Sequence, residues 1–541
     1  MIPRAIAVTF MLAAGLPAQV SWERLLHPER EPQNWLTYSG GSFSQRYSTL
    51  EEIKPDNVKS LEMQWVYQAR SLEKFEATPL VVDGIMYLTE PPNNVVALDA
   101  KTGAIFWVYE YRPANDARPC CGSVNRGLAI LGDTLFMGTI DSRLIAIDAK
   151  AGRPIWNIRI GDPKAGYSIT QAPLIVKDKV IIGVAGAEYG ISGFIAAYNP
   201  ASGKEVWRFN TIPQPGEPGH ETWAGDSWRH GGGSTWVTGS YDASLNTVYW
   251  GVGNPGADWN ADNRKGDNLY SDCAIALDAD TGKLKWYFQF TPHDEFDYDA
   301  VQVPVLVDGN WQGSPRKMMM WANRNGFFYV LDRTNGKFLY GTPFTKETWA
   351  TGLDESGRPI RAATATPTEA GTLIYPGVQG GTNWYSPSYS PRTGLFYIPS
   401  WQDYYMNLAK MPAEYNEGQR YTGGAPRSPV PTLQRGPINT WTAENGSGAV
   451  VAMDPNTGGK KWQFKMTDVT GSGILTTASD IVFTGGREGY FYALDAKDGT
   501  MLWKAALGGP IAMGPITYRI DGRQYVAVAA GHALFTFAMR Q

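Results

Sequence analysis

Cysteine is scarce in this sequence, with three residues among 541. Three cysteines cannot build a disulfide framework, and an odd count leaves at least one unpaired. The five histidines are scattered and show no ligand spacing with cysteine, which argues against a zinc site. Charge is nearly balanced, at 48 basic against 52 acidic residues, so the electrostatic signature of nucleic-acid binding is missing and we expect no nucleic-acid partner.

Long hydrophobic runs are also missing beyond the N-terminus. The first segment has one Arg, an apolar run from Ala5 to Leu16 and small residues ending at Ala18, which is the anatomy of a signal peptide. We expect residues 1–18 to be removed, which takes away only Arg4 and leaves 47 basic against 52 acidic residues, a net charge of -5. The alternative is an uncleaved anchor, although a membrane span needs about 18 apolar residues. The sequence predicts an exported protein without a membrane span.

Glycine and aromatic residues are plentiful, with 60 Gly, 20 Trp and 28 Tyr. Aromatic side chains favour pleated strands and glycine supplies tight turns, so this composition predicts many short strands and little helix. One pattern recurs seven times, with an apolar pair, Asp or Asn, Gly and an aromatic residue at fixed offsets. Each copy reads as strand, turn, strand, and the copies are 97–107, 146–156, 197–207, 276–286, 330–340, 452–462 and 493–503.

Most copies follow another hairpin, which gives four short strands per repeat of roughly 40 to 50 residues. This arrangement is typical of a propeller blade, and a solenoid is the alternative architecture. Segment 389–401 looks like a degenerate copy followed by a long insertion, and we expect segment 35–41 to share the closing blade with the last strands. The sequence therefore predicts an all-β fold, in which residues 19–541 form one eight-bladed β-propeller with tryptophan-docking repeats.

Residues that do not repeat are the candidates for a unique site. A disulfide between the neighbours Cys120 and Cys121 would be strained, because their Cα atoms lie about 3.8 Å apart and a relaxed disulfide needs roughly 4.4 to 6.8 Å. Such strain is seldom kept without a use, and the alternative is a pair of small buried thiols. Trp236 follows a run of glycines and could lay its indole plane against a flat ring.

Acidic and amide residues from three further segments form an oxygen-rich set. Asp297 and Asp299 alternate in PHDEFDYDA (292–300), so in an extended segment both would face one way and would need a neutralising partner. Glu188 and Asn254 stand in glycine-rich segments that follow strands. Hard cations take about six to eight oxygens, so these four residues predict a metal site. Taken singly, each also reads as an ordinary turn or core residue.

The non-repeating motifs resemble those of the quinoprotein alcohol dehydrogenases, the methanol and ethanol dehydrogenase group that uses pyrroloquinoline quinone (PQQ). In chain order they are CC followed by VNRG, then GAEYG, GGGSTW, GNPGADWN, TPHDEFDYD and ANRNG. The resemblance covers nearly the whole mature chain. It implies an eight-bladed propeller with the quinone near its axis, stacked between Trp236 and the ring formed by a Cys120–Cys121 disulfide. The repeat alone is less specific, because it also occurs in propellers without a catalytic role.

The resemblance also implies roles for individual residues. The quinone-binding positions match Glu76, Arg126, Thr170, Ser234, Arg324 and Asn383, with backbone contacts from Gly186 and Ala187. The family's metal-site positions match Glu188, Asn254 and Asp297. Asp297 matches the family's base and would take the proton of a primary alcohol, while Arg324 could stabilise the reduced oxygen. The product implied is an aldehyde.

Asp299 departs from the calcium-dependent members, which usually carry a small uncharged residue at this place. The Asp-Tyr-Asp pattern resembles the lanthanide-dependent branch instead. A trivalent ion of calcium-like size tolerates another carboxylate and polarises a quinone more strongly. We therefore expect one lanthanide(III) ion, with calcium as the alternative ion. The other alternative is that Asp299 is a solvated loop residue without a role at the metal. A second departure is Thr470, at about the place where many relatives carry a Trp.

The expected partners follow from the same resemblance. The sequence has no Cys-x-x-Cys-His motif, so we expect no haem on this polypeptide and electrons to pass to a soluble cytochrome c in the periplasm. We consider a homodimer as the assembly. Two other classes of function stay open, namely a non-enzymatic propeller scaffold like those in outer-membrane assembly factors, and a quinoprotein sugar or polyol dehydrogenase.

Overall fold

The computed structural model describes residues 19–427 and 446–540, so the predicted signal peptide, residues 1–18, lies outside the described residues. Strands dominate, and the described chain has one α-helix, α1 (Trp22–Leu26). Short 3-10 helices serve as connections: η1 (Pro28–Arg30), η2 (Val58–Ser60), η3 (Pro163–Ala165), η4 (Ala187–Tyr189), η5 (His220–Thr222), η6 (Ser227–His230) and η7 (Ala363–Ala365). The all-β prediction is confirmed. Among the described residues, no helix is long and apolar enough to cross a membrane.

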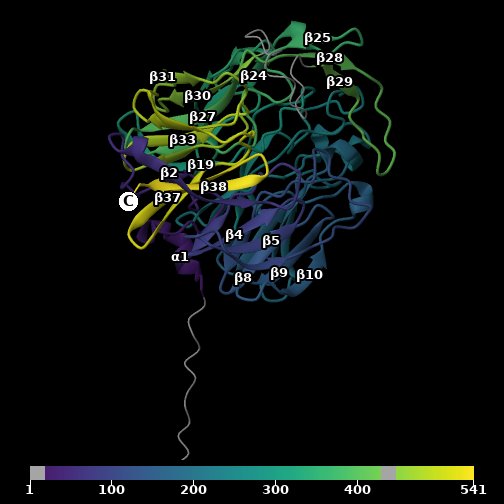
Figure 1. The fold of residues 1–541 in the computed structure, drawn as a ribbon. Coiled ribbons are helices and arrows are strands. Elements are labelled where there is room, and N and C mark those ends of the chain that lie inside the picture. The colour runs from purple at the N-terminus through teal and green to yellow at the C-terminus, as the bar shows by residue number, and fades with distance from the viewer. Residues whose placement is uncertain (1–18, 428–445, 541) are drawn as a thin grey trace, which may run out of the picture.

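Eight sheets of four or five strands make up most of the described chain (Figure 1). Five of them are built from four consecutive antiparallel strands. Their strands are β3 (Leu80–Val82), β4 (Ile85–Glu90), β5 (Asn94–Asp99) and β6 (Ile105–Tyr109); β7 (Ala129–Leu131), β8 (Thr134–Gly138), β9 (Arg143–Asp148) and β10 (Pro154–Arg159); β11 (Leu174–Val176), β12 (Lys179–Gly183), β13 (Phe194–Tyr198) and β14 (Glu205–Asn210); β15 (Ser240–Asp242), β16 (Thr247–Gly251), β17 (Cys273–Asp278) and β18 (Leu284–Gln289); and β19 (Val305–Trp311), β20 (Ser314–Ala322), β21 (Phe327–Asp332) and β22 (Lys337–Pro343).

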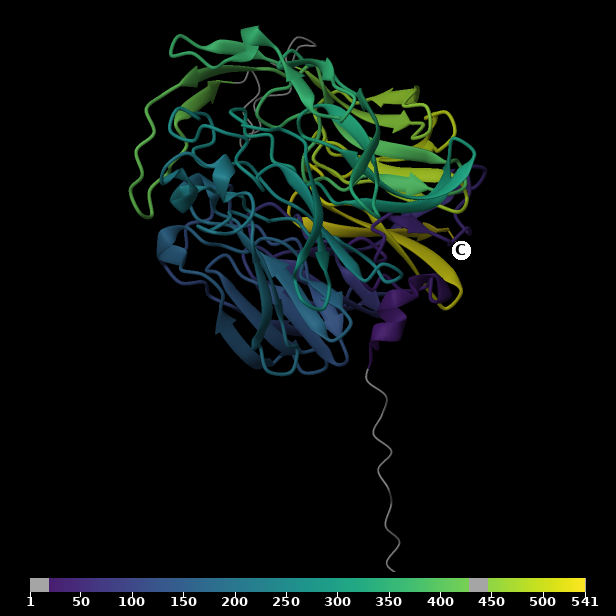
Figure 2. The same cartoon turned by 180° about the vertical axis from the view of Figure 1, so that it is seen from behind.

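The sixth sheet carries the predicted insertion. Its strands are β26 (Ser388–Ser390), β27 (Leu395–Gln402), β30 (Ser447–Met453) and β31 (Lys460–Lys465), so the degenerate copy at 389–401 does form a hairpin. Between β27 and β30 the chain adds β28 (Met406–Lys410) and β29 (Gly424–Arg427), and β28 pairs with β29 on one side and with β25 (Thr372–Ile374) on the other. The pair β23 (Ala350–Leu353) and β24 (Pro359–Arg361) stands apart from the larger sheets. Figure 2 shows the sheet of β25, β28 and β29 on the opposite side of the molecule from the yellow C-terminal strands.

The last two sheets combine both ends of the described chain. In the seventh, β1 (Tyr47–Ser48) pairs in parallel with β32 (Leu475–Thr477), followed by β33 (Ile481–Gly485), β34 (Tyr490–Asp495) and β35 (Met501–Ala506). In the eighth, β2 (Leu61–Gln68) pairs with β38 (Ala533–Met539), next to β37 (Arg523–Ala530) and β36 (Ile516–Ile520) (Figure 1). Assigning segment 35–41 to this sheet was wrong, because Trp35 forms a bridge to Val81 instead and the Ser-Gly-Gly that follows makes no ladder.

Residues of the repeat contact the neighbouring sheet at several junctions. In the first copy, Asp99 accepts the backbone N–H groups of Lys101 and Thr102, and Gly103 takes a φ of 74° that favours glycine. The ring of Trp65 covers that glycine, where a Cβ would lie 2.7 Å from Cε3. Five further tryptophans donate through Nε1, at 2.9 to 3.1 Å, to a carbonyl in a turn of the following sheet: Trp107 to Ala149, Trp156 to Pro200, Trp207 to Ala279, Trp286 to Arg333 and Trp462 to Ala496.

Candidate active site

A disulfide joins Cys120 and Cys121, so the expected bond between neighbouring cysteines is confirmed. The third cysteine, Cys273, is buried and free. Sγ of Cys121 lies 3.8 Å from Oε1 of Glu188. The two sulfur atoms and the carboxylate are close enough to surround a metal ion, but bonded sulfurs are not thiolates. Only the oxygens of Glu188 are therefore ligands for a hard cation at this point.

Arg126 contacts three other residues that were predicted to bind the quinone. Its Nη2 lies 2.8 Å from Oε2 of Glu76, and its Nη1 donates to Oγ1 of Thr170 at 2.9 Å. The guanidinium carbon lies 4.9 Å from the ring centre of Trp236 and 4.4 Å from that of Trp384. Nε is buried without a hydrogen-bond partner. Flat rings beside a buried cation with a spare donor fit a flat, anionic molecule.

Arg324 forms ion pairs with both of the neighbouring aspartates. Its Nη2 lies 3.0 Å from Oδ2 of Asp297 and its Nη1 lies 2.6 Å from Oδ2 of Asp299. The expectation of an extended segment was wrong at this place, because Asp297 has a φ of 63°. Asp294 causes the turn by accepting the backbone N–H groups of Phe296 at 2.9 Å and Tyr298 at 2.8 Å. The turn still brings both carboxylates to one guanidinium.

Asn254 is held between two acidic side chains. Its backbone N–H donates to Oδ1 of Asp299 at 2.9 Å, and its Nδ2 donates to Oδ1 of Asp258 at 3.0 Å. Gly253 permits this approach, because a Cβ there would collide with Asp299 and stand 2.9 Å from Oγ of Ser234. Because Nδ2 faces Asp258, the side-chain oxygen of Asn254 is at the other end of the amide and is free to be a metal ligand.

Glu188 enters the site from the 3-10 helix η4, at the end of β12. The residue before this helix, Gly186, has a φ of 126°, and a Cβ there would collide with a backbone carbonyl, so only glycine fits. The backbone oxygen of Glu188 accepts the N–H of Tyr421 at 2.7 Å. The insertion in the sixth sheet therefore covers this edge of the site. Ala187, the first residue of η4, is buried beside it.

The site contains more buried carboxyl groups than buried guanidinium groups. Burial is the main cause that raises the pKa of five carboxyl groups, those of Glu188, Asp258, Asp272, Asp297 and Asp299. Burial also raises the pKa of Asp294 to about 6. The buried guanidinium groups among them are those of Arg264 and Arg324. Six carboxylates against two guanidinium groups leave four uncompensated negative charges when all are ionised, a surplus that fits a multivalent cation.

Sequence reasoning missed three residues of this site. Asp258 is 1% exposed and its Oδ2 lacks a partner, while Asp272 is 0% exposed and lacks a partner on either oxygen. Trp384 faces the guanidinium of Arg126. Asp258 lies within the GNPGADWN motif and Trp384 ends GGTNW, so both could have been noticed, whereas no motif marks Asp272. Asn383 lies beside Trp384 and accepts that residue's N–H at 2.8 Å through its side-chain oxygen.

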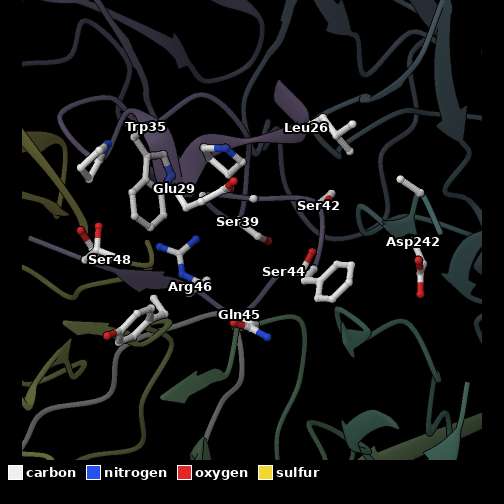
Figure 3. Close-up of a pocket in the computed structure, with 18 of the residues that line it drawn as sticks. Leu26, Glu29, Trp35, Ser39, Ser42, Ser44, Gln45, Arg46, Ser48 and Asp242 are labelled. Atoms are coloured by element: carbon white, nitrogen blue, oxygen red, sulfur yellow. The ribbon is translucent and has the colours of Figure 1, made fainter. Parts of the chain in front are cut away.

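Figure 3 shows a second region of interest, a pocket of about 400 Å³. It is lined by parts of segment 26–49 and by Asp242, the last residue of β15, whereas Ser234 and Trp236 precede that strand. Arg46 extends into this region, and its guanidinium donates to three backbone carbonyls. None of the predicted site residues lines the pocket, so it is separate from the acidic cluster.

Two family models match the chain. The model described as glucose/ethanol/alcohol dehydrogenase, beta-propeller domain, matches residues 35–348. The model described as outer membrane protein assembly factor BamB matches residues 446–538, which contain the last repeats. The chain therefore has an all-β propeller fold. The second match agrees with the expectation that the repeat alone does not distinguish enzymes from scaffolds.

Known proteins resemble the chain over nearly its whole length. The quinoprotein alcohol dehydrogenase PedH of Pseudomonas putida is 39% identical over 555 residues, covering 97% of this chain and 91% of PedH. The crystal structure of the quinohemoprotein alcohol dehydrogenase from Comamonas testosteroni has a TM-score of 0.87 and 36% identity, over 94% of this chain and 80% of that one. A europium-containing methanol dehydrogenase has a TM-score of 0.90 and 33% identity, over 95% of this chain and 100% of that one. The chain belongs to the PQQ-dependent alcohol dehydrogenase family, whose members oxidise alcohols with PQQ and a metal ion.

Proposed function

We propose that this dehydrogenase oxidises primary alcohols to aldehydes and that its metal ion is a lanthanide(III). PQQ would lie over Trp236, next to the Cys120–Cys121 disulfide. The ion would be held by Glu188, Asn254, Asp297 and Asp299. The europium-containing methanol dehydrogenase among the similar structures supports a lanthanide, and calcium is the alternative.

The surplus of buried carboxyl groups is the observation that carries the metal proposal. With all six ionised, four negative charges stay uncompensated after Arg264 and Arg324 are counted. A trivalent ion offsets three of them and a divalent ion offsets two. Because uncompensated charge is costly away from water, the site favours the ion of higher charge. Asp299, the residue that departs from the calcium-dependent pattern, contributes one of these charges.

The residues around Arg126 and Arg324 suit the quinone. Both guanidinium groups are buried and would donate to quinone oxygens or carboxylates, and Arg126 has a spare Nε. The other residues that we assign to the quinone are Glu76, Thr170, Ser234 and Asn383, with Gly186 and Ala187 through their backbone.

Asp297 is the proposed base. When bound, PQQ and the ion supply the two-electron oxidant and the Lewis acid for the CH–OH group. The side chain of Asp297 is 17% exposed and that of Asp299 is 7% exposed, so Asp297 is the more accessible of the pair to an alcohol. Asp297 then accepts the hydroxyl proton. Arg324 holds Asp297 in place through its Nη2 and provides positive charge where negative charge develops.

The wider organisation is proposed on the same basis. The eight sheets are taken as eight blades of one domain, residues 19–541, and the tryptophan Nε1 bonds between consecutive sheets support docking of each blade on the next. Residues 1–18 would direct export to the periplasm. Electrons would leave to a separate cytochrome c, because the sequence has no Cys-x-x-Cys-His motif for haem attachment.

The test compares the wild-type protein with Asp299→Ala and with Glu295→Gln as a control. Glu295 lies in the same segment but pairs with Arg361 instead of Arg324. Each protein is loaded with PQQ and with lanthanum or calcium, and bound metal and dye-coupled oxidation of primary alcohols are measured. We expect higher activity with lanthanum for the wild type and the control, and loss of this preference for Asp299→Ala. Equal activity with calcium in the wild type would contradict the lanthanide assignment.

A further inference from the structure

Asp258 is a buried acid that the proposed function uses neither as a metal ligand nor as a base. It lies four residues after Asn254, in the connection between β16 and β17. Its side chain is 1% exposed, Oδ1 accepts from Nδ2 of Asn254 at 3.0 Å, and Oδ2 is buried without a hydrogen-bond partner. An unpartnered carboxylate oxygen away from water lowers stability, so its presence here calls for a functional reason.

The chemistry of the asparagine amide supplies that reason. The two ends of the amide have similar size and shape, but only the oxygen can bind a cation. Oδ1 of Asp258 accepts from Nδ2 of Asn254 at 3.0 Å, so this contact selects the orientation in which the amide nitrogen faces Asp258 and the amide oxygen faces away from it. The backbone of Asn254 is fixed separately, by the bond from its N–H to Asp299 at 2.9 Å. Nδ2 also lies 3.4 Å from the backbone oxygen of Pro255, so Asp258 supplies the shorter of the two hydrogen bonds that hold the amide against rotation.

We propose that Asp258 is a positioning residue of the metal site, which locks the Asn254 amide with its oxygen toward the ion. This inference rests on the metal site proposed above. Asp258 need not touch the ion, because it acts through the amide.

The proposal predicts opposite effects on metal binding and on the stability of the metal-free protein. Removing an outer partner of a metal ligand weakens metal affinity by about 10- to 100-fold. Asp258→Ala also deletes one buried oxygen that has no hydrogen-bond partner, so the metal-free protein should melt at the same or a higher temperature. A purely structural role for Asp258 would instead lower the melting temperature with and without metal.

The experiment measures europium affinity of the PQQ-loaded protein by equilibrium dialysis against chelator-buffered europium, with bound metal counted by mass spectrometry. The variants are Asp258→Ala and the milder Asp258→Asn. Asp272→Ala is the matched control, since Asp272 is an equally buried acid without a hydrogen bond to a proposed ligand. Asp258→Ala is also made in an Asn254→Asp background, where both side-chain oxygens are equivalent and no orientation has to be chosen.

We expect Asp258→Ala to bind europium about 10- to 100-fold more weakly than the wild type. Asp272→Ala should lose less affinity, and Asp258→Ala should lose none in the Asn254→Asp background. The inference is overturned if Asp258→Ala and Asp272→Ala lose affinity equally, or if the loss persists with Asn254→Asp. Failure of the metal site itself gives a different result, in which the wild type binds no stoichiometric europium or Glu188→Gln binds it as well as the wild type.

Discussion

Replacing Arg324 by glutamine tests whether a cation lies between Asp297 and Asp299. In the protein without metal, the guanidinium is the positive group in contact with both carboxylates, at 3.0 and 2.6 Å. Glutamine keeps a polar side chain of similar reach but removes the charge. Two like charges would then face each other in a largely buried place.

The size of the effect can be worked out from the burial. Removing one partner of a buried ion pair costs about 3 to 5 kcal/mol. Unfolding entropy of about 2.1 cal/mol/K per residue gives roughly 1.1 kcal/mol/K for a chain of this length. The melting temperature of the metal-free protein should therefore fall by about 3 to 5 °C. Bound lanthanum would supply the missing positive charge, so the deficit of Arg324→Gln should shrink to less than about 2 °C in the loaded protein.

Arg333→Gln is the matched control for this experiment. Arg333 is 0% exposed and also bridges two carboxylates, those of Asp242 at 2.7 Å and Asp308 at 2.5 Å. Differential scanning fluorimetry of PQQ-loaded protein, with and without lanthanum, measures both variants. Arg333→Gln should lose stability by the same amount in both states. If the deficit of Arg324→Gln is equally insensitive to lanthanum, then Asp297 and Asp299 do not surround the ion.

Two further predictions concern the turns and the buried acids. Gly152→Ala should lower the unfolding free energy, measured by chemical denaturation, by roughly 2 kcal/mol more than Gly394→Ala. Both glycines have a φ near 65° to 68°, but only at Gly152 would a Cβ lie 2.5 Å from the ring of Trp107. Equal losses in the two variants would argue against close docking of Trp107. The pKa of Asp294 is raised to about 6, so its contribution is complete below about pH 4 and lost as the pH rises through 6. Relative to Asp294→Asn, the metal-free wild type should lose about 3 kcal/mol of stability between pH 4 and 7.5, and a difference that stays constant with pH would refute this.

Local pattern was sufficient for the hairpins but not for the closure of the fold. The repeat at 97–107 predicted β5, its turn and β6, because apolar alternation, the Asp turn and the glycine lie within a few residues of one another. The strand that closes the eighth sheet pairs Leu61–Gln68 with Ala533–Met539, more than 460 residues away, and no local signal ranks one early segment above another. Buried and exposed residues alternate in the second half of β2, so the sequence pattern was that of a strand. It did not show that the partner strand is the last one of the chain.

The site shows a similar limit. Motifs identified Glu188, Asn254, Asp297 and Asp299 as one oxygen-rich set, and the structure links Asn254, Asp297 and Asp299 through short contacts. The prediction that Asp297 is extended was wrong, because the carboxylate of Asp294 accepts hydrogen bonds from the backbone N–H groups that follow it and forms a turn. The alternating aspartates gave no sign of this turn. Residues such as Asp272 stayed hidden because their burial depends on packing between segments rather than on their neighbours in sequence.

The proposed ligands come from loops of three consecutive sheets. Glu188 follows β12 of the third sheet, Asn254 follows β16 of the fourth, and Asp297 and Asp299 lie between β18 and β19, where the chain passes from the fourth sheet to the fifth. The tryptophan contacts tie these sheets together through turns of the repeat, away from these loops. In the metal-free protein the loops bring like charges together and Arg324 compensates only part of them. An ion bound there would therefore link the sheets as well as take part in the reaction. It would relieve the repulsion between the same carboxylates that would activate the alcohol.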